Sequence, residues 1–173
     1  MSQQNTTLES VAKVLLINNK NEILTLTLSE HLKYPKKSYQ PDLPGGIVDP
    51  GESEQLAVIR EVQEECGIDL DASKIKLAYS ATAYYEKESK SVTKLLYIAH
   101  LGDTPSVTLS WEYSAYQWVS FDELQAIDLP PFFKEAIYYL AVKDALYLLT
   151  EQLFRQRKLL VHKFHRQTIH TGI

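Results

Sequence analysis

The chain has 173 residues, a length that suits one domain with its own hydrophobic core. Its formal net charge of −4 argues against general nucleic-acid binding. The single cysteine, Cys66, excludes an internal disulfide and favours a reducing compartment. Residues 1–9 lack the layout of a secretion signal, and no window has the roughly 18 apolar residues of a membrane span. We therefore expect a cytoplasmic protein with no membrane partner.

The first part of the chain predicts a β-hairpin followed by a loop. Residues 11–17 form a dense apolar run that suits a buried strand, and residues 22–28 resume a strand after a polar turn. Residues 29–42 are interrupted by two prolines and predict a loop. The next four residues are Leu43-Pro44-Gly45-Gly46, where paired glycines suit a tight turn or a close approach to a ligand.

A helix is predicted from residue 52 or 53 to Gly67, a glycine that suits a left-handed C-cap. Glu61, Glu64 and Glu65 have the spacing i, i+3, i+4 and project from one face of this helix. Like charges this close weaken a bare helix. A solvated acidic face is the ordinary interpretation. A divalent cation would explain the arrangement better, since hard cations take carboxylate oxygens.

The second half of the chain predicts another hairpin, from residues 75–85 and 92–101 on either side of a charged segment. Residues 117–120 predict a short strand. A short helix should then open at residue 121, with Ser120 as N-cap and Glu123 completing a capping box.

From Pro130 onward the apolar residues recur at three- and four-residue steps, so this part is predicted to be helical. The helix is expected either to run unbroken to about residue 164 or to break near Thr150. Mixed strands with one central helix and terminal helices predict an α/β layered fold. We expect residues 1–173 to form a single domain, with a helical C-terminal extension from about residue 130.

Residues 46–68 resemble the Nudix box, Gly-x5-Glu-x7-Arg-Glu-U-x-Glu-Glu-x-Gly-U with U apolar, and match every specified position. The resemblance implies an α/β/α sandwich with a mixed β-sheet. It also implies a Mg²⁺-dependent hydrolase, with Mn²⁺ as an alternative cofactor. Such an enzyme cleaves a phosphoanhydride bond in a nucleoside diphosphate linked to another group, so the partner would be a small-molecule nucleotide. A homodimer is common in this family.

The resemblance also implies roles within the box. It makes Glu64 and Glu65 the principal metal ligands, with Glu61 as a third ligand or as the residue that orients water. The Gly46 carbonyl would be a further metal contact. We expect Arg60 to orient a catalytic glutamate. The box positions occupied by Glu52 and Gly67 are expected to support the site, Glu52 by pairing with Arg60.

Outside the box, Glu112 precedes a Trp-containing strand, in a place that resembles the position of the family's general base or additional metal ligand. Where the family often has His after this Glu, the chain has Tyr113. An exposed loop glutamate is the alternative interpretation. We expect Glu112 to act as a catalytic residue.

Two groups of residues are candidates for substrate binding. Lys33, Lys37 and Tyr39 lie just before the glycine pair and could contact phosphates or a base, although the lysines could also only solubilise a loop. Tyr84 and Tyr85 follow the box at the distance seen in relatives that act on dinucleoside polyphosphates. Strand alternation predicts that one of these two tyrosines is packed. The sequence assigns no subfamily.

The sequence disfavours three rival functions. A catalytically silent module that binds a nucleotide as a sensor would usually lack box glutamates, and here all are present. Nucleic-acid binding through the basic residues of 151–173 is disfavoured because no known DNA-binding module fits there. Isomerase chemistry of the same fold needs a catalytic cysteine outside the box, whereas Cys66 is the only cysteine.

Overall fold

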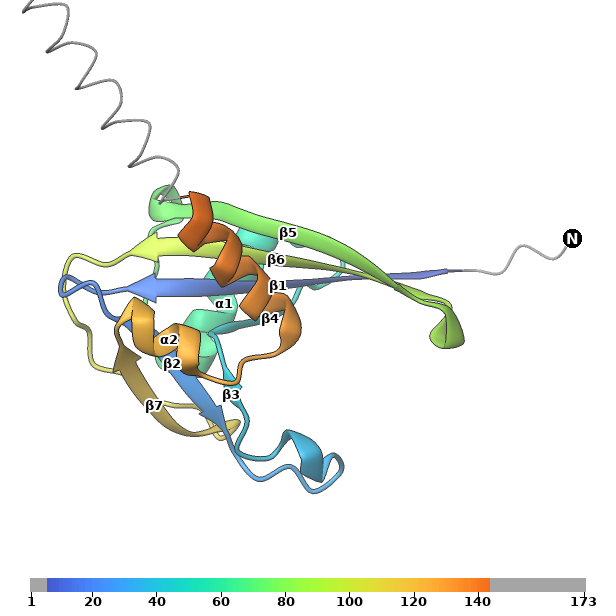
Figure 1. Cartoon of the computed structure of the whole chain (residues 1–173), viewed down its shortest axis with the longest axis horizontal. Helices are drawn as coiled ribbons and strands as arrows, with labels where there is room; N and C mark the ends of the chain where they lie inside the picture. Colours follow the sequence, from blue (N-terminus) through green and yellow to red (C-terminus); the bar gives the residue numbers. More distant parts are fainter. Residues whose placement is uncertain (1–5, 144–173) are drawn as a thin grey trace, which may run out of the picture. The chain divides into compact units, whose positions relative to one another are not determined.

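The computed structural model describes residues 6–143 (Figure 1). Its seven strands form one sheet with the central order β3-β2-β1-β6-β5, while β4 pairs with β1 and β7 pairs with β2. The strands are β1 (Thr7–Ile17), β2 (Ile23–Leu28), β3 (Pro41–Asp42), β4 (Gly45–Ile47), β5 (Ile75–Tyr85), β6 (Lys90–His100) and β7 (Tyr113–Val119). β1 runs parallel to β6 and the remaining pairs are antiparallel, so the sheet is mixed.

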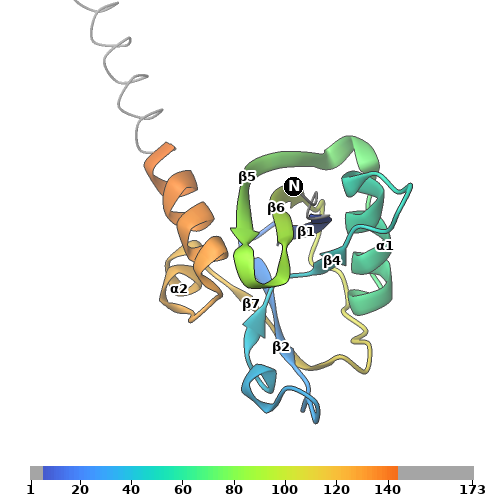
Figure 2. The same ribbon diagram turned by 90° about the vertical axis from the view of Figure 1, so that its right-hand side faces the viewer.

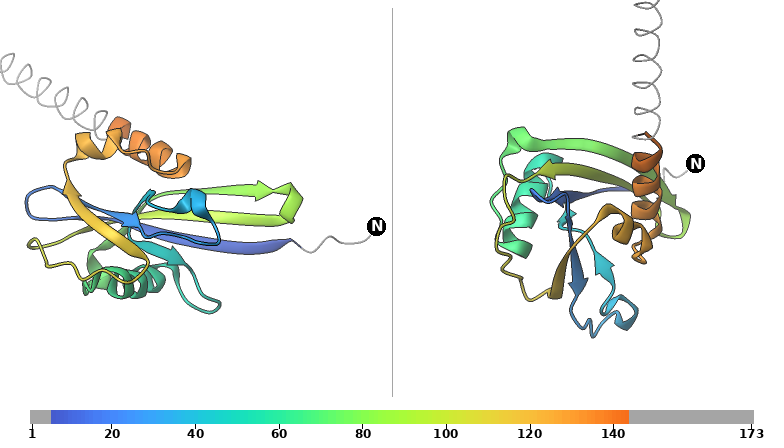
Figure 3. Two further views of the ribbon diagram at one scale, coloured as in Figure 1. Left: turned by 90° about the horizontal axis from the view of Figure 1, so that it is seen from below. Right: turned by 60° about the vertical axis from the view of Figure 1, so that its left-hand side comes forward.

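Two α-helices lie on opposite faces of this sheet, as Figure 3 shows. They are α1 (Glu54–Cys66) and α2 (Phe121–Ala126). Short 3-10 helices occur at Pro35–Lys37, Ala72–Lys74 and Glu86–Glu88. The predicted α/β fold with a mixed sheet is confirmed. The predicted cap of the second helix is also present, since Ser120 and Glu123 form a capping box.

The described residues up to Ala136 belong to one compact unit, and those from Ile137 onward belong to a second. A further helix occupies positions 131–143, up to the end of the described residues, which agrees with the prediction of a helix from about residue 130. The expected course of this helix to about residue 164, its alternative break near Thr150 and the basic segment 151–173 lie outside the described residues. Within the described residues, no helix is both long enough and apolar enough to cross a membrane.

The core forms where β1 meets α1. Alternate residues of the strand (Ala12, Val14 and Leu16) pack with residues one helical turn apart (Val58, Val62 and Cys66). Cys66 is fully buried, and burial raises the pKa of its thiol to about 12. Cys66 is therefore a packing residue of the core.

Long-range pairing extends two strands beyond their predicted ends. β1 begins at Thr7 rather than at residue 11 because it pairs with the whole of β6. The ion pair between Glu9 and Lys90, at 2.7 Å, links their polar ends. β7 begins at Tyr113, four residues before the prediction, because its first half pairs with β2.

The glycine pair, for which a tight turn or a close approach to a ligand is predicted, belongs to strand β4, which pairs with β1 and lies beside α1 (Figure 2). Gly45 has a φ of 119°, and a Cβ there would lie 2.3 Å from the carbonyl oxygen of Ala12. Gly45 thus lies close to the backbone of β1, and the predicted approach to a ligand stays a prediction. The predicted loop 29–42 also contains β3 and a 3-10 helix.

Candidate functional site

Helix α1 carries the box glutamates and has a cap at each end. The hydroxyl of Ser53 accepts a hydrogen bond from the Leu56 N–H at 3.3 Å. Gly67 ends the helix in the left-handed conformation, with a φ of 66°, and its N–H donates to the Gln63 carbonyl. The predicted extent of the helix and its C-cap are confirmed.

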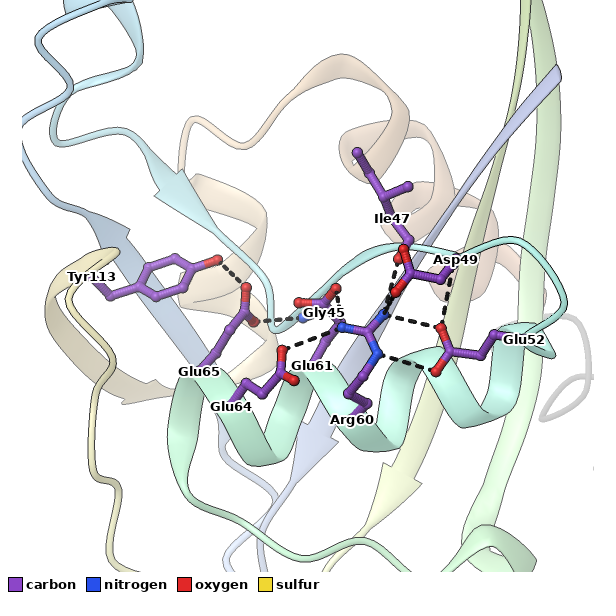
Figure 4. Close-up of polar contacts among 9 residues, drawn as sticks. All are labelled: Gly45, Ile47, Asp49, Glu52, Arg60, Glu61, Glu64, Glu65 and Tyr113. Atoms are coloured by element: carbon purple, nitrogen blue, oxygen red, sulfur yellow. Dashed lines mark hydrogen bonds and ion pairs between the residues drawn. The ribbon is translucent and has the colours of Figure 1, made fainter. Parts of the chain in front are cut away.

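Arg60 is the centre of an ion-pair cluster between α1 and the segment from Ile47 to Glu52 that leads into it (Figure 4). Its Nε and Nη2 donate to the two oxygens of Glu52 at 3.1 and 3.0 Å, so the predicted pairing is present. Its Nη1 donates to Glu61 at 2.8 Å and to Glu64 at 3.3 Å, and Nη2 also donates to the Ile47 carbonyl at 3.2 Å. These pairs raise the pKa of Arg60, and the bond from Arg60 lowers the pKa of Glu52.

Glu65 lies in a different environment from the other box glutamates. Only 4% of this residue is exposed. Its carboxylate accepts hydrogen bonds from the Gly45 N–H at 2.8 Å and from the Tyr113 hydroxyl at 2.7 Å. Burial raises its pKa to about 7, and Lys13 and the two hydrogen bonds partly oppose that effect.

The segment before β7 is hydrogen-bonded to the C-terminal end of α1. The Thr108 N–H donates to the Cys66 carbonyl at 2.9 Å, and the Ser110 N–H donates to the Glu65 carbonyl at 3.0 Å. These bonds satisfy carbonyl groups that a helix end otherwise leaves without partners. They also bring Tyr113, three residues after Ser110, to the side chain of Glu65.

Gly46 lies against Glu61. A Cβ at Gly46 would lie 2.5 Å from the carboxyl carbon of Glu61, far inside van der Waals contact. Gly46 is not among the glycines with a positive φ, so it is the space occupied by Glu61 that requires a glycine here. The backbone of β4 and the Glu61 carboxylate therefore lie side by side, as a shared metal site needs.

The donor set fits a hard divalent cation in its chemistry. Glu61, Glu64, Glu65 and the Gly46 carbonyl offer only oxygen atoms, the donors that Mg²⁺ prefers. Among the described residues no three acidic, His or Cys side chains converge on one point, and Arg60 bonds to both Glu61 and Glu64. The Glu64 side chain is 60% exposed, so it can leave Arg60 at low cost.

Glu112 lies just before β7, exposed, on a segment bonded to the loop that follows β2. Its carbonyl accepts from the Ser29 N–H at 2.8 Å, and the carbonyl of Trp111 accepts from the Ser29 hydroxyl at 3.0 Å. Glu112 lines a pocket of about 430 Å³ together with Trp111, residues 28–32 and Lys33. Among the contacts of the described residues, none joins its side chain to the box glutamates. Its catalytic role remains a prediction.

Of the predicted residues in the loop after β2, the structure brings Lys33 and Lys37 to one aromatic ring. The ammonium groups of Lys33 and Lys37 lie 5.2 and 5.3 Å from the centre of the Tyr34 ring. Tyr39 is 61% exposed. Lys37 also lines a pocket of about 550 Å³, together with Lys36, Lys134 and other residues. This loop therefore presents several cations next to two pockets.

Tyr84 and Tyr85 lie near the tip of the β5–β6 hairpin, which extends away from α1 (Figures 1 and 3). They are 56% and 42% exposed, so the expectation that one of them packs is wrong. The reason is that β5 is an edge strand with both faces largely exposed. Their role in substrate binding stays a prediction.

Sequence reasoning missed a polar group that contacts Glu65 from outside the box. It consists of Lys13, Asp42 and Tyr113, joined by hydrogen bonds. Lys13 left one signal, because a lysine in the middle of an apolar strand needs a buried partner. For Asp42, the sequence has no signal that distinguishes it from an ordinary acidic residue in a loop.

The family model described as the NUDIX domain matches residues 7–140. A curated relative, the asymmetrical bis(5'-nucleosyl)-tetraphosphatase of Caenorhabditis elegans, is 34% identical over 90 residues, which is 52% of this chain and 64% of the relative. Relatives of the same name from Sus scrofa, Rattus norvegicus and Mus musculus are 32–37% identical over 81 residues. The chain thus spans less than two thirds of the length of the curated relatives that it matches first.

Solved structures agree with the fold. The chain is similar to the MutT protein of Methanosarcina mazei Go1, with 28% identity, a TM-score of 0.68 and coverage of 82% of this chain and 99% of that one. It is also similar to a C. elegans Ap4A hydrolase binary complex, with 26% identity, a TM-score of 0.55 and coverage of 78% and 98%. With the complete box on α1 and the family match over most of its length, the chain belongs to the Nudix family.

Proposed function

We propose that this protein is a hydrolase that cleaves a phosphoanhydride bond in a nucleoside diphosphate linked to another group. The observation that carries the proposal is the arrangement of Arg60, Glu61, Glu64 and Glu65 on one face of α1, beside the backbone of Gly46. An all-oxygen donor set next to a guanidinium is suited to handling phosphates and their metal ions.

The residues act in three ways in this proposal. Glu61, Glu64, Glu65 and the Gly46 carbonyl would hold Mg²⁺, with Mn²⁺ as the alternative. When bound, the metal neutralises phosphate charge and activates a water. Arg60 orients Glu61 and Glu64, and Glu52 fixes Arg60 in turn. Glu112 is the proposed general base, because it precedes Tyr113, which contacts Glu65, and because it lines a pocket.

The first substrate class to test is a dinucleoside polyphosphate. Its support is that the four curated relatives described above carry the name of a bis(5'-nucleosyl)-tetraphosphatase. Lys33 and Lys37 are proposed to bind phosphates, and the aromatic side chains of Tyr39, Tyr84 and Tyr85 to contact a base. Unequal cleavage of a dinucleoside tetraphosphate would give a nucleoside monophosphate and a triphosphate, whereas equal cleavage would give two diphosphates.

The rival proposal is a nucleotide-binding sensor without catalysis. It is disfavoured because every box glutamate is present and because Glu64 is exposed enough to bind a metal. We also propose that the chain acts as a single domain with a helical extension from about residue 130, in the cytoplasm, with a homodimer as one assembly. The single buried cysteine supports a reducing compartment.

The test is a Mg²⁺-dependent hydrolysis screen with wild type, Glu64→Gln and the control Glu54→Gln. The panel holds nucleoside triphosphates, oxidised nucleotides, ADP-ribose, nucleotide sugars, coenzyme A and dinucleoside polyphosphates. We expect a loss of at least about 10²-fold for Glu64→Gln, the order of a few kcal/mol of transition-state stabilisation. Glu54 is an exposed glutamate of the same helix outside the box positions, so its variant should retain activity.

Chromatography of the products then identifies which bond is cleaved. Turnover of no substrate, together with tight binding of one nucleotide, would contradict the hydrolase and favour the sensor. Equal activity of Glu64→Gln and wild type would contradict the role of the box glutamates.

A further inference from the structure

We propose that the ion pair between Lys13 and Asp42 makes the Tyr113 hydroxyl donate its hydrogen bond to Glu65 and not to Asp42. Lys13, Asp42 and Tyr113 are then positioning residues for the Glu65 carboxylate. This inference rests on the proposed function, in which Glu65 is a metal ligand. It concerns residues outside the Nudix box, and it is carried by hydrogen-bond geometry and burial.

The four residues come from four different elements and meet in the interior. Lys13 lies on β1, Asp42 on β3, Tyr113 on β7 and Glu65 on α1. The side chains of Lys13 and Asp42 are 10% and 16% exposed, and Tyr113 and Glu65 are 6% and 4% exposed as whole residues. Polar groups this well buried need partners, and here the partners are one another.

The Tyr113 hydroxyl has one proton and two acceptors within reach. Its oxygen lies 2.7 Å from Oε1 of Glu65 and 3.3 Å from Oδ2 of Asp42. Asp42 is already satisfied without this proton. Its Oδ2 accepts from the Lys13 ammonium at 2.8 Å, and its Oδ1 accepts from the Leu43 N–H at 2.8 Å. The proton therefore goes to Glu65, at the shorter distance.

This arrangement fixes Glu65 before any metal arrives. A carboxylate has about four lone-pair sites, and the Tyr113 hydroxyl and the Gly45 N–H use two of them. The two carboxylate oxygens are held by buried neutral donors, so the remaining lone pairs of Glu65 point in a fixed direction. Glu61 and Glu64, by contrast, contact the more exposed Arg60. Glu65 is thus preorganised to bind a metal, whereas the side chains of Glu61 and Glu64 would move when a metal binds.

Two roles of Lys13 can be separated by the sign of its effect. At a pH where Glu65 is ionised, the nearby positive charge of Lys13 would repel the cation, so on this ground alone its removal would strengthen binding. As the partner of Asp42, Lys13 strengthens binding, because without it Asp42 would compete for the Tyr113 proton. Positioning by Lys13 also requires Tyr113, whereas the charge effect does not.

The experiment is a direct titration of Mn²⁺ and of Mg²⁺ into the metal-free full chain by calorimetry. Tyr113→Phe removes only the hydroxyl, and we expect it to weaken metal binding about 10- to 100-fold, as loss of a group that orients a ligand does. The matched control is Tyr116→Phe, an exposed tyrosine on the same strand, which should bind metal like wild type.

Lys13→Met should also weaken binding, by at least about 10-fold, and the double variant Lys13→Met/Asp42→Asn should recover most of that loss because the competing charge is gone. In a Tyr113→Phe background, Lys13→Met should cause no further weakening. Tighter binding by Lys13→Met, or unchanged binding by Tyr113→Phe, would overturn the inference.

Circular dichroism checks that each variant is folded. Lys13→Met leaves a buried carboxylate without its cation, so it is the variant most at risk of unfolding. If it does not fold, Tyr113→Phe against Tyr116→Phe still decides the claim about Glu65, and unchanged metal binding by Tyr113→Phe still overturns the inference. Because the titration needs no substrate, a failure of hydrolysis with an intact Tyr113 effect would count against the proposed function alone.

Discussion

Arg60 and Glu52 face each other edge to edge, with Nε–Oε1 at 3.1 Å and Nη2–Oε2 at 3.0 Å, while Nη1 of the same guanidinium reaches Glu61 and Glu64. The two-point contact fixes the plane of the guanidinium. Glu52 therefore sets, through Arg60, the orientation of two glutamates that lie later on the helix.

Arg60→Lys should lower activity although it keeps the charge. A lysine ammonium is a point donor and cannot bond to Glu52 edge to edge while also reaching Glu61 and Glu64. We expect kcat to fall about 10- to 100-fold with a small loss of stability, since Arg60 is partly exposed. Steady-state kinetics and thermal denaturation measure both effects. Full activity of the lysine variant would show that charge alone matters.

The adjacent glycines should respond differently to the same substitution. In Gly45→Ala the new Cβ would meet the Ala12 carbonyl oxygen at 2.3 Å in a backbone with a φ of 119°, so the strand must move. We expect a stability loss of at least about 2 kcal/mol.

In Gly46→Ala the nearest atoms to the new Cβ are those of the Glu61 carboxylate, the end of a flexible side chain that can rotate away. This variant should fold, with a melting temperature close to wild type, but lose activity because Glu61 is displaced. Thermal denaturation and the hydrolysis assay, run on both variants, check the contrast. An inactive, unfolded Gly46→Ala or a stable Gly45→Ala would contradict it.

Glu65 should give the metal-free protein a pH-dependent stability. Its pKa rises from 4.5 to about 7 in the folded state because the residue is buried, so between these values the folded state binds more protons than the unfolded state. The free energy of unfolding should therefore fall as pH rises through this window, by roughly 3 kcal/mol in total. Denaturant unfolding in EDTA from pH 4.5 to pH 8 measures it.

Glu65→Gln supplies the comparison, because an amide does not titrate. The difference between wild type and Glu65→Gln should shrink as pH falls toward 4.5, while Glu54→Gln should follow wild type throughout. A constant difference across the window would mean that Glu65 is already ionised in the folded protein at low pH.

Gly67→Ala should reduce both stability and activity. Gly67 has a φ of 66°, and its Cβ would lie 3.2 Å from Cβ of Thr108. We expect a loss of about 1 kcal/mol, and a smaller loss for Gly67→Asn, because asparagine tolerates the left-handed conformation better. Since Thr108 lies in the segment that leads to Tyr113, activity should fall with stability. Melting curves and kcat for both variants test this, and a more stable Gly67→Ala would contradict the cap.

Local signals predicted much of this molecule. The capping box at Ser120, the C-cap at Gly67 and the pairing of Glu52 with Arg60 all depend on residues within eight positions of each other, and all are present. The box itself predicted the family. These features follow from short-range geometry, which a sequence shows directly.

Features that depend on distant pairing were missed. The first half of β7 has no strong strand signal in Tyr113–Tyr116 and forms because it pairs with β2. The ends of β1 depend in the same way on β6. The contact of Lys13 with Asp42 joins residues 29 positions apart, and that of Tyr113 with Glu65 joins residues 48 positions apart. Their partners became known only from the folded structure.

Glu65 holds the segment before β7 at two points, by its main-chain carbonyl at Ser110 and by its carboxylate at Tyr113. Both ends of the stretch from Ser110 to Tyr113 are therefore hydrogen-bonded to Glu65, so the number of residues between them cannot change without breaking one of these bonds. One inserted residue adds about 3.3 Å of chain, more than a hydrogen bond can absorb. Insertions should be tolerated before Thr108, and an insertion between Ser110 and Tyr113 should separate the loop of Glu112 from helix α1.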